Sequence, residues 1–166
     1  MYKRILVPLD GSKVAEGILS HVHQLAKATG GEILLLRVLQ PVPLEGGYPR
    51  PIEMRTKSAY KYLARLQDTL ASQGVSATVA VTAGVQAGDA ISTWAGEHEV
   101  DLIALMSHGF GRAARAVFGS VAERLLERSP VPVLVVRATP EVLEQQEEQE
   151  EDELDEELLF RMGALG

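Results

Sequence analysis

The sequence predicts an α/β protein in which an open, five-stranded, mainly parallel sheet carries helices on both faces. Short apolar runs alternate along the chain with segments where apolar residues recur every three or four positions, the spacing of one helix face. Clusters that contain glycine, proline or aspartate separate these segments. Such alternation favours parallel strands joined by right-handed crossovers. We therefore expect a Rossmann-like domain over residues 1–139. The strand order that we predict for it is 3-2-1-4-5.

Each expected element has its own signal. The expected strands are the runs at residues 4–9, 33–38, 77–81, 102–106 and 131–136. We take the run at 33–38 as continuously apolar, which is typical of a strand covered on both faces. Three of the expected helices are marked by apolar stripes: Val14, Ile18, Val22 and Leu25; Ala59, Leu63, Leu66 and Leu70; and Ile91, Trp94 and Ala95. Asp89 is expected to cap the third of these helices. A fourth helix is expected over Ser120–Arg128. Gly30 and Gly74 are expected to end the first two helices. Pro130 and Pro132 flank the start of the last strand, which favours an edge position.

The net charge of −7 is unevenly distributed along the chain. Eleven acidic residues lie from Glu141 to Glu157, and Arg161 is the only basic residue after them. The eleven acidic residues and Arg161 together give the tail a charge of −10, which leaves residues 1–139 at about +3. Long-range attraction of DNA by the whole molecule is disfavoured, so we expect no nucleic-acid partner. We treat residues 140–166 as an acidic C-terminal tail that is either disordered or partly helical.

The composition also indicates the cellular compartment in which we expect the protein. The longest apolar runs fall far short of the ~20 residues that a membrane-spanning helix needs, so we expect no membrane partner. The opening residues lead directly into a strand pattern that is too short for a signal-peptide core. The chain has no cysteine, which excludes disulfides and thiol catalysis and is compatible with a cytoplasmic protein.

A loop of small residues after the fourth strand is the strongest candidate for a binding site. It begins Met106-Ser107-His108-Gly109-Phe110-Gly111-Arg112, and Gly119-Ser120-Val121 opens the next helix. Backbone N–H groups converge at a helix start, where the helix dipole favours an anion such as phosphate. Ligands of open parallel sheets bind at the carboxyl ends of strands, beside the switch in strand order. If strands 1 and 4 are neighbours, Asp10 faces the same crevice.

Two clusters resemble the universal stress protein family. The first is Ile5-Leu6-Val7-Pro8-Leu9-Asp10-Gly11-Ser12, which is similar to the family's opening strand and acidic turn. The second is Ser107-His108-Gly109, nine residues, Gly119-Ser120-Val121-Ala122-Glu123-Arg124, and the closing strand Pro130-Val131-Pro132-Val133-Leu134-Val135-Val136. Order, spacing and flanking elements agree over residues 2–137. Members that bind ATP carry Gly-x-x-Gly, nine residues, then Gly-Ser or Gly-Thr, and Met106 occupies the first glycine position here.

The resemblance implies an ATP site, with Mg²⁺ as an accompanying ion. It implies that Asp10 takes the ribose hydroxyls, that Pro8 and Leu9 line the nucleoside, and that Val38 contacts adenine. The residues implied to wrap or cap the phosphates are Ser107, His108, Gly109, Gly111, Arg112, Gly119, Ser120 and Val121. Because Met106 has a side chain, backbone approach to a ligand is less free there.

The resemblance also implies a homodimer through residues 131–136. An apolar edge strand invites pairing with a second chain, although the chain's own tail could cover that edge instead. A further protein partner is expected from a sensor or regulator, but nothing in the residues identifies it.

Several alternatives stay open. Asp10 is also an ordinary turn or helix-cap residue, and His108 either shapes the turn or carries a proton. The Walker phosphate motif is absent, as is the Ser-Gly-Gly-x-Asp-Ser loop of adenylating enzymes. No positioned base is evident, so we expect at most slow ATP hydrolysis. We predict a homodimeric, ATP-binding stress-response sensor or regulator, and the alternative is a non-nucleotide-binding signalling or interaction module of the same fold.

Overall fold

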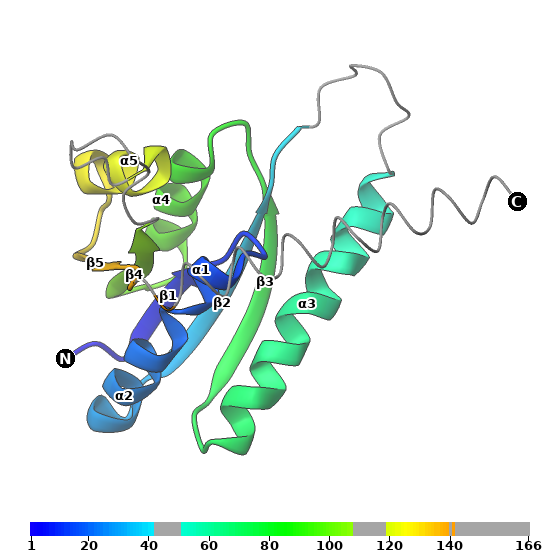
Figure 1. Cartoon of the computed structure of the whole chain (residues 1–166). Coiled ribbons are helices and arrows are strands. Elements are labelled where there is room, and N and C mark those ends of the chain that lie inside the picture. The colour runs from blue at the N-terminus through cyan, green and yellow to red at the C-terminus, as the bar shows by residue number, and fades with distance from the viewer. Residues whose placement is uncertain (42–50, 108–118, 140, 142–166) are drawn as a thin grey trace, which may run out of the picture.

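The five strands form one parallel sheet in the order β3-β2-β1-β4-β5 (Figure 1). The computed structural model describes residues 1–41, 51–107, 119–139 and 141. Within them the strands are β1 (Arg4–Pro8), β2 (Glu32–Leu39), β3 (Ala77–Ala83), β4 (Leu102–Ser107) and β5 (Val133–Arg137). All four described strand pairings are parallel. The predicted α/β class and strand order are therefore confirmed.

Helices cover both faces of the sheet, as predicted (Figure 1). One face packs against α1 (Lys13–Glu16), α2 (Leu19–Thr29) and α3 (Ile52–Ser72), and the other against α4 (Ala87–Glu97) and α5 (Ser120–Arg128). Successive strand residues point to opposite faces. Ile5 and Val7 accordingly belong to the core under α1, α2 and α3, whereas Leu6 belongs to the core under α4 and α5.

The first predicted helix is divided into α1 and α2. The Ile18 N–H donates to the Ala15 carbonyl, three residues back, which tightens the backbone between the two helices. The apolar stripe still continues across the division, because Val14, Ile18 and Val22 are all buried. Gly30 ends α2 in the left-handed conformation at φ 61°, which glycine adopts without steric cost.

Two other local expectations are wrong. Asp89 does not cap α4, because Gln86 holds that position and Asp89 lies in the first helical turn. The run at residues 33–38 is not continuously apolar, because Arg37 interrupts it. Arg37 shares its face of β2 with Ile33 and Leu35, which lie in the core under α3.

The last strand lies at an edge of the sheet, as Pro130 and Pro132 indicate. Among the described strands, β5 pairs with β4 alone. No helix in the described ranges is both long and apolar enough to cross a membrane. Of the acidic tail only Glu141 is described, so the predicted state of residues 140–166 otherwise lies outside the described residues.

Candidate functional site

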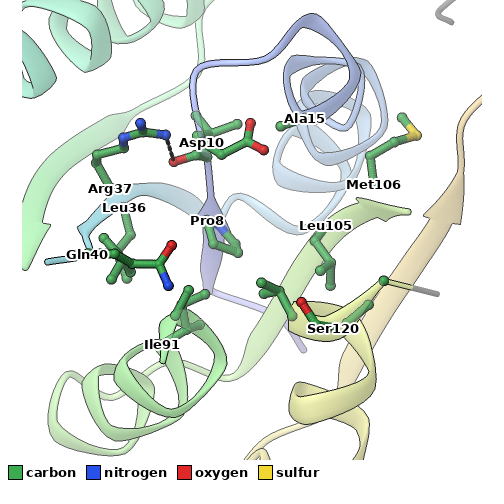
Figure 2. A pocket seen from close by; sticks show the side chains of 16 residues that line it. Pro8, Asp10, Ala15, Leu36, Arg37, Gln40, Ile91, Leu105, Met106 and Ser120 are labelled. Carbon is green, nitrogen blue, oxygen red and sulfur yellow. Dashed lines mark hydrogen bonds between the residues drawn. The ribbon is translucent and has the colours of Figure 1, made fainter. Parts of the chain in front are cut away.

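A cavity of about 380 Å³ lies at the carboxyl ends of the strands (Figure 2). It is centred where the strand order switches, because β2 and β3 lie on one side of β1 while β4 and β5 lie on the other. We call it the switch-point cavity. Its lining residues are Pro8, Leu9, Asp10, Ala15, Leu36, Arg37, Val38, Gln40, Ala87, Ile91, Leu105, Met106, Gly119, Ser120, Val121 and Ala122.

The structure brings most of the predicted site residues together in this cavity. The predicted residues among its lining are Pro8, Leu9, Asp10, Val38, Met106, Gly119, Ser120 and Val121. Ser107 is not among them: it is the buried end of β4, and its carbonyl accepts a hydrogen bond from the Ala138 N–H at 3.2 Å. The predicted residues His108, Gly109, Gly111 and Arg112 lie outside the described residues.

Asp10 both builds the turn after β1 and faces the cavity. Its Oδ1 accepts hydrogen bonds from the Ser12 N–H at 2.9 Å and the Ser12 hydroxyl at 2.6 Å. The Ser12 hydroxyl oxygen in turn accepts from the Ala15 N–H at 3.1 Å and caps α1. Asp10 Oδ2 has no hydrogen-bond donor among the described residues. The turn and ligand interpretations of Asp10 are therefore compatible.

The start of α5 faces Asp10 across the cavity. Gly119 precedes the helix at φ 83°, a left-handed conformation that a side chain would strain. The first N–H groups of a helix have no partner within the helix, and they carry the positive end of its dipole. Figure 2 shows the Ser120 side chain beside Leu105, with its hydroxyl at the cavity. This end of the cavity is suited to an anion.

Met106 does not fill the space in front of α5. Its side chain lies on the α1 side of β4 and is directed away from Ser120 (Figure 2). It is only 7% exposed and belongs to the core under α1, α2 and α3. The departure from the family's glycine therefore adds core packing on one face of β4.

The end of β2 supplies an edge of backbone donors and acceptors. The Leu36 carbonyl accepts from the Leu9 N–H at 2.9 Å, on the β1 side, and the Leu39 carbonyl accepts from the Gly84 N–H at 3.2 Å, on the β3 side. Backbone polar groups of successive strand residues alternate between the two sides. The Val38 N–H and C=O therefore point to the β1 side, beyond the last bond that β1 makes.

Gln40 was missed by sequence reasoning. Its Nε2 donates to the Val85 carbonyl at 3.1 Å, and this bond fixes the orientation of the amide. Figure 2 shows the amide between Leu36, Pro8 and Ile91, with Oε1 on the Pro8 side. The only sequence signal was its position directly after β2, two residues beyond Val38, a spacing that directs both side chains to the same side of an extended chain.

Arg37 was also missed. Its Nη1 donates to the Leu9 carbonyl at 3.2 Å. Figure 2 shows its guanidinium on one side of the end of β1 and the Asp10 carboxylate directed to the other side. These opposite charges form no ion pair among those described. A basic residue inside an apolar strand pattern was the available signal.

An ion pair fastens the two helices on the opposite wall. Arg124 of α5 donates from Nε to Asp89 Oδ1 at 2.7 Å and from Nη2 to Oδ2 at 2.9 Å. Hydrogen bonding by Arg124 lowers the pKa of Asp89. Gly88 permits the close approach, because a Cβ there would lie 2.7 Å from the Arg124 Cβ. The positions of Ala87 and Ser120 in the cavity wall follow from this packing.

The fold and site agree with a sequence comparison. The family model described as the universal stress protein family matches residues 1–137. The chain belongs to this family. A universal stress protein of Synechocystis is 32% identical over 136 residues, which cover 82% of this chain and 86% of that protein. One of Methanocaldococcus jannaschii, MJ0531, is 28% identical over 142 residues, which cover 82% of this chain and 83% of that protein.

Solved structures of universal stress proteins have the same fold. The chain is 28% identical to the MJ0577 protein of Methanocaldococcus jannaschii, with a TM-score of 0.67 over 84% of this chain and 98% of that one. A more distant structure, from Archaeoglobus fulgidus, is a complex with dAMP (21% identity, TM-score 0.61, 81% and 98% covered). Another, from Arabidopsis thaliana, has AMP bound (14% identity, TM-score 0.61, 84% of this chain and 94% of that one covered).

Proposed function

We propose that this universal stress protein binds an adenine nucleotide, with ATP as the expected ligand, in the switch-point cavity. In this proposal it acts in the cytoplasm as a homodimeric sensor or regulator. The observation that carries the proposal is the arrangement of polar groups around one apolar cavity. A donor–acceptor edge lies at Val38, a carboxylate at Asp10, and a helix N-terminus at Ser120. The solved relatives that hold AMP and dAMP support the same ligand class.

The end of β2 is complementary to adenine in particular. The Watson–Crick edge of adenine offers an acceptor at N1 and a donor at its exocyclic amine. The Val38 N–H would donate to N1, and the Val38 carbonyl would accept from the amine. Gln40 Oε1 is oriented to accept the amine's second proton, because its Nε2 is held by the Val85 carbonyl. Guanine reverses both groups and would leave buried polar atoms unpaired, which costs about 1–3 kcal/mol each.

The rest of the cavity would hold the ribose and phosphates. Asp10 Oδ2, which has no donor among the described residues, would accept from a ribose hydroxyl, while Pro8, Leu36 and Ile91 would supply apolar contact for the base. The Ser120 hydroxyl and the first N–H groups of α5 would donate to phosphate oxygens. This proposal keeps the predicted phosphate contacts of the loop after β4, which come from Ser107, His108, Gly109, Gly111 and Arg112. It also keeps Met106 as a residue that lines the nucleotide site.

Mg²⁺ would enter with ATP. Magnesium in nucleotide sites is held by one or two carboxylates together with the phosphates. Asp10 is the one carboxylate among the described residues that line the cavity, and no group of three His, Asp or Glu residues is placed to hold a metal in the described ranges. The ATP phosphates and water would therefore supply most of the magnesium ligands. We propose at most slow hydrolysis.

The test is calorimetric titration of the protein with ATP and Mg²⁺, using wild type, Asp10→Asn and Asp68→Asn. The asparagine side chain in the Asp10→Asn variant keeps the Oδ1 acceptor for Ser12 but loses the charge. We therefore expect affinity to fall about tenfold to a hundredfold, as for a charged hydrogen bond of about 1.5–3 kcal/mol. Asp68 is exposed on α3 and should not matter. Undetectable binding by wild type at millimolar ATP would favour the non-nucleotide-binding module instead.

The homodimer is proposed to form through β5. This strand lies at an edge, Leu134 is 37% exposed, and Val133, Val135 and Val136 are half-buried. An apolar edge is suited to pairing with a second copy. We expect a dimer mass by light scattering for wild type and a monomer mass for Leu134→Lys. A monomeric wild type would contradict the pairing and favour an edge covered by the chain itself.

A further inference from the structure

A second cavity lies on the other face of β2. It has a volume of about 430 Å³ and is lined by Gly11, Arg37, Leu39, Met54, Arg55, Ser58, Ala59 and Tyr62. Residues from the first half of α3 form one wall, and the odd-numbered residues of β2 form the other. We call it the β2–α3 cavity. It has no role in the nucleotide binding proposed above.

Two arginines line this cavity, and neither has a carboxylate partner among the described residues. Arg37 donates to the Leu9 carbonyl at 3.2 Å, and Arg55 donates from Nη2 to the Gln40 carbonyl at 2.7 Å. Neither takes part in any ion pair between described residues. A guanidinium has five N–H donors, so each arginine retains most of its donors for another acceptor. Both are only partly exposed, which strengthens their effect on an anion.

The nearby acidic groups are already engaged. Glu16 accepts from Lys13 at 3.0 Å and from Arg65 at 3.2 Å. The Asp10 carboxylate is directed to the opposite side of β1 from Arg37 (Figure 2). The positive charge of Arg37 and Arg55 is therefore not neutralised from within the described residues.

The remaining walls are largely apolar. Leu39 and Ala59 are buried, and Met54 is 59% exposed. The ring of Tyr62 forms one side, and burial, together with the charge of Glu16, raises the pKa of this phenol. Tyr62 therefore adds no negative charge at neutral pH. Such walls favour a ligand with an apolar body beside its charged group.

We infer that the β2–α3 cavity binds a small organic anion, with a carboxylate or phosphate held by Arg37 and Arg55 and an apolar body on Leu39, Met54 and Ala59. Guanidinium groups bind both oxyanions through paired N–H donors. The site is separate from the proposed nucleotide site, but Arg37 lines both cavities. An anion held by Arg37 is therefore placed to influence a nucleotide on the opposite face of β2.

The test is a titration followed by backbone amide NMR, with benzoate as the probe and benzyl alcohol as a matched ligand without charge. Benzoate should shift the Gly11, Leu39 and Ala59 signals of the full-length protein saturably, whereas benzyl alcohol should bind at least tenfold more weakly. Inorganic phosphate tests the need for an apolar body. We expect it to shift the same signals with lower affinity than benzoate. Tighter binding of phosphate than of benzoate would overturn the apolar part of the inference.

Variants on α3 separate a built site from general surface charge. Arg55→Gln should weaken benzoate tenfold or more, and Ser58→Phe should block the cavity without changing charge. Lys57→Gln removes one charge from an exposed neighbour that does not line the cavity, so it should bind as wild type does. No saturable shift, or an equal loss in Lys57→Gln, would overturn the proposal. Because ATP is titrated separately, failure of the nucleotide proposal would leave these readouts unaffected.

Discussion

The two faces of β2 end in different chemistry. Leu36, Val38 and Gln40 face the switch-point cavity, where this end of β2 presents only neutral polar groups, the Val38 backbone and the Gln40 amide. Arg37 and Leu39 face the β2–α3 cavity, where two guanidinium groups lie over an apolar base. One strand serves both because its side chains alternate and because β1 ends before it does. The difference teaches that one strand end can line two chemically different cavities without any insertion in the fold.

The largest effect is expected from neighbouring leucines on opposite faces. Leu35 and Leu36 are both fully buried, but only Leu36 lines the switch-point cavity. We expect Leu35→Ala and Leu36→Ala each to lower the free energy of unfolding by about 2–5 kcal/mol, measured by urea denaturation. Only Leu36→Ala should also weaken ATP, by about tenfold, because it removes apolar contact with the base. Equal ATP affinity in the two variants would break the comparison.

Met106 makes the next comparison, between core packing and ligand access. Its side chain lies against α1, so we expect Met106→Ala to lower the free energy of unfolding by about 2 kcal/mol, the lower end for a buried methionine. ATP affinity should change by less than about threefold, which is less than ~0.7 kcal/mol, because the side chain leaves the space before Ser120 clear. A tenfold gain in affinity would show instead that the methionine obstructs the ligand, as its replacement of the family's glycine first suggests.

Sequence reasoning could predict the parallel sheet and a cavity at the carboxyl ends of its strands, because both depend on repeating patterns and on the order of elements. The predicted strand order 3-2-1-4-5 is confirmed, but alternation alone does not distinguish it from the other common order of such sheets, 2-1-3-4-5. It could not predict that Met106 turns toward α1, since the direction of a side chain at a strand end depends on packing with another element. It missed Gln40 and Arg37 for the same reason. Their roles depend on where β1 stops and on what α3 places opposite. The misplaced cap at Asp89 has a tertiary cause, because Arg124, 35 residues away, binds that carboxylate.

A smaller effect is expected from the amide of Gln40. ITP lacks the exocyclic amine of ATP. If Oε1 accepts from that amine, Gln40→Leu should lower the ratio of ATP affinity to ITP affinity by about fivefold, which is the equivalent of one hydrogen bond of about 1 kcal/mol. Gln67 is a matched control, because its Nε2 also donates to a backbone carbonyl, that of Ala77, at 2.7 Å. Gln67→Leu should leave the ATP-to-ITP ratio unchanged. An unchanged ratio in Gln40→Leu would remove the side chain from base recognition.

The smallest effect concerns an arginine that has its own carboxylate, in contrast to Arg37. Arg124 lowers the pKa of Asp89 in the folded state, so this pair stabilises the fold above the unfolded pKa, near 3.8, and the contribution is lost as pH falls through the lower folded value. The free energy of unfolding is measured with urea from pH 7 to about pH 3. In Asp89→Asn it should fall slightly less than in wild type as the pH is lowered, and in Asp68→Asn it should fall as in wild type. The Asp89–Arg124 pair is exposed, so the difference in free energy of unfolding should be small. A large difference would mean that the packing of α4 on α5 depends on this ion pair. Benzoate affinity should be equal in both variants, because the guanidinium groups that hold the anion are those without a carboxylate.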